Sequence, residues 1–161
     1  MEFYQTPGGR MGIKDIPPVL TDLLRQIPQC ADAESEEVEA RLYPAPSIAP
    51  GEDQLREDWK AHVEPELHTF FLSSRQVVEA DLRGMKEDDI AGTIEFPFKH
   101  AEAWLNALNQ ARLALAAQHN LGEKELSHPG PMQILNERDL ALLQINFYAA
   151  IQQWLVEALD F

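Results

Sequence analysis

Three long stretches of the chain repeat apolar residues every three or four positions. This spacing places the apolar side chains on one face of an α-helix, and that face must be buried against another element. We therefore predict a mainly α fold, a bundle of three long helices over residues 52–84, about 98–119 and about 137–159. The inward residues would be Leu55, Trp59, Val63, Leu67, Phe71, Val78 and Leu82, then Trp104, Leu105, Leu108, Ala111 and Leu115, then Leu140, Leu143, Phe147, Ile151, Trp154 and Leu155.

The first long helix contains a proline in its middle. Its apolar repeat runs through Pro65 without a change of phase. Proline removes one backbone hydrogen bond, and its ring clashes with the preceding turn. We predict one helix over residues 52–84 that is kinked near Glu64 and Pro65. Two separate helices joined at Pro65 are the alternative that the sequence leaves open.

Two shorter helices are expected before the first long one. Apolar residues at helical spacing follow Pro17-Pro18 and stop before Pro28. Proline is favoured in the first turn of a helix and breaks a helix interior, so these prolines predict where this helix begins and ends. Residues 34–42 predict a second short helix, and the prolines that follow it predict an irregular connection.

The ends of the last two long helices carry local signals. Gly122 lies just past the second long helix, where a glycine commonly ends a helix. Residues 122–131 are predicted to be a loop. Asn136, with Asp139 three residues later, has the spacing of an N-cap and predicts the start of the last helix.

Short strands are predicted near the N-terminus. Residues 1–15 are expected to be extended on both sides of Pro7-Gly8-Gly9, because paired glycines supply the positive φ of a tight hairpin turn. Residues 92–96 alternate in polarity and stop at Pro97. We predict a small N-terminal β-hairpin, which this third short strand could join.

Length and composition indicate one globular domain over residues 1–161. The chain has 161 residues, of which 45% are hydrophobic, and a domain of that size holds a core without disulfides or metals. The single cysteine, Cys30, cannot form an intrachain disulfide, which fits a reducing compartment. The start lacks a signal-peptide pattern, and no apolar run reaches the ~18–20 residues that span a bilayer. These features predict a cytoplasmic protein.

The chain is strongly acidic, with 27 acidic and 13 basic residues and a net charge of −14. Nucleic acids and anionic membranes attract Lys and Arg clusters, so we expect neither as a partner. Residues 31–66 hold eleven acids against three bases, more than half of the net charge. This acidic segment is therefore a candidate surface for a protein partner, and the sequence leaves self-association open.

The usual motifs of catalysis are missing from the sequence. Cys30 has no base nearby in the sequence, no Gly-x-Ser-x-Gly occurs, and no phosphate-binding loop follows Gly8-Gly9. Carboxylate-bridged metal sites in bundles need two Glu-x-x-His pairs and further inward glutamates. We predict no catalytic residues, no metal ligands and no cofactor. The pairs whose spacing resembles that of metal ligands are His62/Glu66, Glu64/His68 and Glu125/His128.

Asn109 and Arg112 are the candidate binding residues. They lie three residues apart on one helix face, among apolar residues. A guanidinium close to a core must be paired, or it costs several kcal/mol. Arg112 is expected either to pair with an acid on another helix, for instance one near the C-terminus, or to line a cleft that receives an anion. In the first case both residues would be structural.

Residues 103–115 resemble the Trp-Leu-x-x-Leu-Asn-x-x-Arg-Leu stretch of a bacterial family of domains of unknown function, number two-thousand-and-seventeen. Residues 148–159 look like the closing helix of that family, and residues 41–46 are similar to its Arg-Leu-Phe-Pro-Pro-Ala element with the last two residues exchanged. The resemblance implies no known activity. It implies a gene neighbourhood with the adaptor of a Clp-type protease. The signature positions that match are Trp104, Leu108, Asn109, Arg112 and Leu113.

We therefore expect a non-enzymatic cytoplasmic interaction or regulatory protein, linked to Clp-type proteolysis by the gene neighbourhood of the family alone. The alternative is a helical bundle that binds a small molecule or an anion, with or without enzymatic activity, in a cleft near Asn109 and Arg112.

Overall fold

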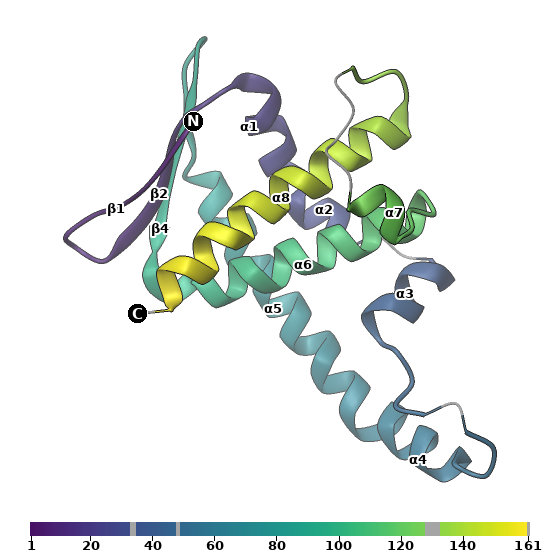
Figure 1. The fold of residues 1–161 in the computed structure, drawn as a ribbon. Coiled ribbons are helices and arrows are strands. Elements are labelled where there is room, and N and C mark those ends of the chain that lie inside the picture. The colour runs from purple at the N-terminus through teal and green to yellow at the C-terminus, as the bar shows by residue number, and fades with distance from the viewer. Residues whose placement is uncertain (33–34, 48, 128–132, 161) are drawn as a thin grey trace.

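A computed structural model describes residues 1–32, 35–47, 49–127 and 133–160. A small antiparallel sheet lies at one side of a group of helices (Figure 1). The strands are β1 (Glu2–Gln5), β2 (Arg10–Ile16), β3 (Lys86–Glu87) and β4 (Gly92–Pro97). The helices are α1 (Pro18–Arg25), α2 (Ile27–Ala31), α3 (Glu36–Leu42), α4 (Asp53–Asp58), a π-helical turn η1 (Trp59–Val63), α5 (Glu64–Arg83), a 3₁₀ turn η2 (Phe98–His100), α6 (Ala101–Gln118), α7 (Glu123–Leu126) and α8 (Glu137–Leu159).

The predicted fold class is confirmed. The described residues form a mainly helical structure with three long helical stretches and an N-terminal β-hairpin. The predicted third strand is β4, which pairs with β2, and the short β3 adds a fourth strand on its far side. None of the described helices combines the length and the apolar character needed to cross a bilayer.

The sheet places one apolar face on the helices. Its strand order is β1-β2-β4-β3, and every pair is antiparallel. The β1–β2 turn uses Gly9 at φ 78°, as the paired glycines predict. Met11, Ile13 and Phe96 are fully buried on the inner face, and the Phe96 ring stacks on Trp104 of α6 at 4.5 Å between ring centres. The sheet therefore fixes the start of α6.

The predicted kinked helix is one helical run from Asp53 to Arg83. Its turn before the proline is widened, because the N–H of Glu64 donates to the carbonyl of Trp59, five residues back. Such a π-turn is a known way for a helix to absorb an irregularity. Pro65 has no N–H to donate, so the break in the hydrogen-bond ladder falls beside it.

Three boundary predictions need correction. Pro28 does not stop the helical region, because it lies in the first turn of α2, where its missing N–H is harmless. Asn120, at φ 50°, takes the left-handed position after α6 that was expected near Gly122. The predicted loop over 122–131 contains α7, and residues 128–132 lie outside the described residues.

The predicted N-cap of the last helix is confirmed. The Asn136 side chain accepts a hydrogen bond from the backbone N–H of Asp139 at 2.9 Å, and α8 begins at the next residue. The Asp139 carboxylate accepts in return from the backbone N–H of Leu135 at 3.0 Å. The start of α8 is therefore fixed by local side chains.

Gly92 lies where β4 meets α1, and we predict that Gly92→Ala is destabilising. A Cβ at this position would lie 2.4 Å from Cγ2 of Thr21, a fully buried side chain that also donates to the Pro18 carbonyl. The expected cost is about 1–3 kcal/mol, typical of overpacking, and is measured by chemical denaturation.

Gly8→Ala is the matched control, because the nearest atom to its added Cβ lies 3.8 Å away. Thr21→Ser removes the opposing methyl group and should recover most of the stability lost in Gly92→Ala. If Gly92→Ala and Gly8→Ala have equal stability, the close packing of β4 on α1 is wrong.

Candidate functional site

Arg112 pairs with an amide and not with the acid that the sequence suggested. Its Nη1 donates to Oε1 of Gln152 on α8 at 2.6 Å. Its Nε is shielded from solvent and has no hydrogen-bond partner among the described residues. Burial lowers the pKa of the Arg112 guanidinium, because no nearby anion offsets the loss of water.

Gln152 links Arg112 to the backbone of the same helix pair. Its Nε2 donates to the Leu105 carbonyl at 3.2 Å, so one amide joins two points of α6 to α8. Asn109 is exposed and lies on α6 beside this link. Neither Asn109 nor Arg112 lines the groove between α2 and α5 or the smaller hollow formed by Phe70, Glu102, Leu105 and Asn106. The described contacts of Arg112 therefore join α6 to α8.

A part-buried Asp–His–Trp cluster, which the sequence did not indicate, joins α5 to α6. The Asp81 carboxylate accepts a hydrogen bond from Trp104 Nε1 at 2.9 Å and contacts His100 Nδ1 at 2.9 Å. An Asp–His pair can activate a nucleophile. In the part of the chain that the structure describes, no hydroxyl or thiol is hydrogen-bonded to His100. The cluster holds two helices together.

The histidines and glutamates whose spacing resembles that of metal ligands have other contacts. His68 Nε2 lies 3.8 Å from Glu64, and its ring stacks on Tyr43 at 3.9 Å. The Glu125 carboxylate accepts from the backbone N–H of Gly122, which lowers its pKa, and it also pairs with Arg138. Its proposed partner His128 lies outside the described residues. Within the described ranges, no three His, Cys, Asp or Glu side chains gather as metal ligands.

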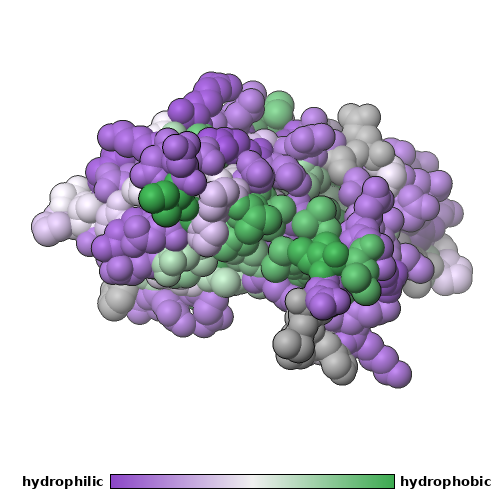
Figure 2. Space-filling model, turned by 90° about the horizontal axis from the view of Figure 1, so that it is seen from above, coloured by the Kyte–Doolittle hydropathy of each residue, from purple (hydrophilic) through white to green (hydrophobic). Residues whose placement is uncertain are grey.

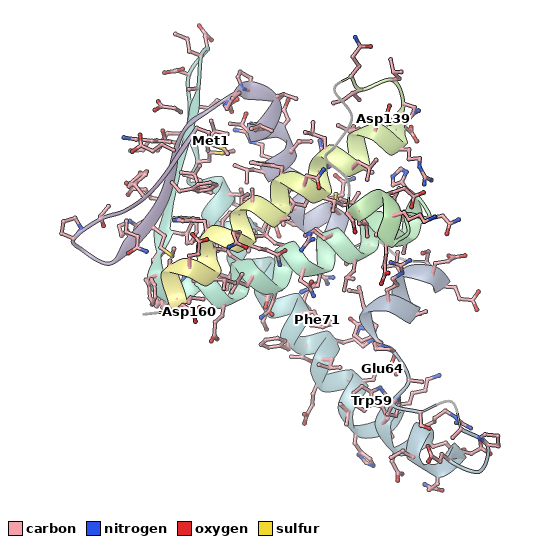
Figure 3. The ribbon with its side chains drawn as sticks, viewed as in Figure 1. Met1, Trp59, Glu64, Phe71, Asp139 and Asp160 are labelled. Atoms are coloured by element: carbon pink, nitrogen blue, oxygen red, sulfur yellow. The ribbon has the colours of Figure 1, made fainter. Side chains whose placement is uncertain are left out.

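The first two-thirds of the long helical run extend away from the core. We call residues 53–72 the arm. None of residues 53–73 is buried, whereas the next turns of α5 bury Ser74, Val78 and Leu82. Figure 3 shows Trp59, Glu64 and Phe71 along this projecting segment, far from the sheet and from α8. The apolar stripe predicted for residues 55–82 therefore reaches the core only at its C-terminal end.

Apolar side chains on the arm face solvent. Leu55, Val63, Phe70 and Leu72 keep between 37% and 51% of their surface exposed. The same residues are interspersed with charge, because the arm carries five acidic and two basic residues. A helix with exposed apolar residues and no core beneath them is typical of a binding surface.

The arm has a defined shape, because the preceding segment packs along it. Arg56 donates to the carbonyls of Ser47 and Ala49 at 3.2 and 3.1 Å and pairs with Asp53. The Tyr43 ring, which follows α3, stacks on His68 and tilts against Phe71 at 5.6 Å. These contacts cover one side of the arm.

A second apolar surface lies on the upper face of the molecule. Figure 2 shows a band of hydrophobic residues across this otherwise hydrophilic face, and α1 and the start of α8 are the helices on that side (Figure 1). Their half-buried Leu20, Leu140, Leu142 and Leu143 all pack against the core. None of the apolar residues of the arm is among those that pack against the core.

Comparison with known proteins places the chain in a family. A family model described as "Domain of unknown function (DUF2017)" matches residues 11–159. The chain belongs to this family. The match covers the arm, every long helix and the sheet except β1, which lies before residue 11. No curated protein and no solved structure matches the chain.

The Arg112 contact leads to a stability prediction. Arg112→Ala should cost about 1–2 kcal/mol, because it removes a side chain packed between α6 and α8 together with the hydrogen bond to Gln152. Arg112→Met keeps the apolar stem and removes a partly buried charge that no acid among the described residues pairs, so it should be neutral or stabilising. Thermal and denaturant unfolding measure both variants. A loss above about 3 kcal/mol for Arg112→Met would indicate an unseen anionic partner.

Proposed function

We propose that this member of the family is a non-enzymatic protein-interaction module, and that the arm is its binding surface. The observation that carries the proposal is the run of residues 53–73 without one buried side chain, on a helix whose apolar residues are exposed. A helix gains most of its stability in a protein from packing an apolar face. A partner that covers this face would supply that packing.

The charge of the arm defines the chemistry of the partner. Residues 53–72 hold Asp53, Glu57, Asp58, Glu64 and Glu66 against Arg56 and Lys60. The partner surface would therefore present Lys or Arg around an apolar groove that takes Leu55 and Val63. Complementary charge mainly raises the association rate and excludes wrong partners, while buried apolar contacts supply the affinity. Like charge disfavours a second copy of this chain at the same surface.

A component of Clp-type proteolysis is the first candidate partner to test, because the family resemblance implies that gene neighbourhood. The proposal does not depend on this candidate. It requires only a partner that is basic and apolar where it meets the arm.

Replacing two exposed apolar residues of the arm should abolish partner binding. We expect the double variant Leu55→Ser, Val63→Ser to lose a partner that the wild-type chain retains from native lysate at low salt. Both side chains are at least 37% exposed, so the fold should persist, as circular dichroism would show. The retained protein is then purified, and its dissociation constant for each chain is measured directly.

Val156→Ser on α8 is the matched control, because Val156 is an exposed apolar residue outside the arm. It should bind as the wild type does. Binding through the arm should also weaken as salt is raised, since the contact is charged. The proposal is wrong if the double variant binds as tightly as the control, or if the wild-type chain retains only itself.

A further inference from the structure

A groove lies on the opposite side of α5 from the Asp81 cluster. It has a volume of about 610 Å³, a size typical of small-molecule sites. One wall comes from the end of α1 and from α2, and the other wall comes from the C-terminal half of α5. The groove uses none of the residues weighed from the sequence as a binding site.

Three arginines line this groove in a strongly acidic protein. Arg25, Arg75 and Arg83 stand against two carboxylates, those of Asp32 and Glu79. The chain as a whole has 27 acidic and 13 basic residues. Arginines outnumber carboxylates by three to two among the lining residues, so the groove is less negative than the average surface, although each arginine has a carboxylate partner.

Arg75 is the fixed member of this set. Its side chain is only 18% exposed, and its two terminal nitrogens are held by the Ala31 carbonyl and by Asp32, each at 3.2 Å. Both partners lie at the C-terminal end of α2. Arg75 is therefore held in one orientation, with its guanidinium in the lining of the groove.

Arg83 is the arginine that can change its partner. It contacts Glu79, four residues earlier on α5, at 3.4 Å, and its side chain is 73% exposed. Exposed pairs of this kind are weak, about 0.3–0.5 kcal/mol. An incoming anion can take Arg83 from Glu79 at little cost. Arg25 is held more firmly, because it pairs with Glu87 of β3.

The rest of the groove is apolar. Leu72, Leu82 and Pro28 line it beside the arginines, and Leu72 is exposed at the base of the arm. A ligand that covered Leu72 would gain from its burial. One carboxylate suits the lining better than a doubly charged phosphate, because Asp32 and Glu79 repel additional negative charge.

We infer that the groove between α2 and α5 binds a small amphipathic carboxylate, with its apolar body on Leu72 and Leu82 and its head at Arg83. Arg75 and Arg25, each held by its own carboxylate, line the groove beside that head. This site shares only Leu72 with the arm, and the inference does not rest on the partner surface proposed there.

The inference is tested with decanoate as the probe, below its micelle-forming concentration, on the full chain. Titration calorimetry gives the affinity, and backbone amide shifts of the isotope-labelled chain locate the site on α2 and α5. Decanamide lacks the charge and butyrate lacks the long apolar body. Each should bind at least about tenfold more weakly than decanoate.

Substitutions in the two partners of the Arg83–Glu79 ion pair should change the affinity for decanoate in opposite directions. Arg83→Gln removes the head contact and should weaken decanoate binding by about tenfold. Glu79→Gln removes the competing carboxylate and should tighten binding by about three- to tenfold, with the amide shifts still located on α2 and α5. Arg10→Gln is the control, because Arg10 forms a similarly exposed pair with Glu95 on the sheet.

Several results would overturn the inference. These are no binding of decanoate by the wild type, equal binding of decanamide, amide shifts confined to other elements, or a Glu79→Gln variant that binds no more tightly than the wild type. Equal weakening by Arg83→Gln and Arg10→Gln would show a general charge effect and would also contradict a site at Arg83.

Discussion

The carboxylate of Asp81 is the contact on which the architecture depends most. It accepts the indole N–H of Trp104, a residue with no solvent exposure, and it also contacts His100 at the start of α6. The Trp104 ring in turn stacks on Phe96 of β4. One side chain of α5 thereby connects this helix to α6 and, through the stacked rings, to the sheet. Loss of the carboxylate would leave a buried donor unpaired, a penalty of about 1–3 kcal/mol.

This connection lies near the C-terminal end of α5, which explains why the rest of the helical run is free of the core. Ser74, Val78 and Leu82 lie on the anchored turns, and the arm extends from them. The π-turn at Trp59–Val63 lets the helix continue past Pro65 without a second anchor. Both proposed sites lie on the same helical run. The partner surface is on the arm, and the arginine-lined groove is on the C-terminal turns of α5 beside α2.

Local signals in the sequence predicted most of the elements. The Asn136 and Asp139 cap depends on neighbours in the chain, and so does the alternation of residues 92–96. The burial of each apolar position could not be predicted in the same way. Leu55 and Val78 share one stripe, yet only Val78 is buried, because burial depends on what packs opposite. The Arg112–Gln152 contact and the gathering of Arg25 with Arg75 also join residues far apart in sequence, which no spacing rule identifies.

Native-state hydrogen exchange along residues 53–83 tests the central claim most directly, because it reports how firmly each turn of one helix is held. The account predicts that the free energy of amide exchange rises sharply near Ser74. Amides of the arm should exchange through local opening at low free energy, while those around Val78 and Asp81 should exchange only in global unfolding. Uniformly high protection from Asp53 to Arg83 would show that the arm is held as firmly as the core, and would contradict the account.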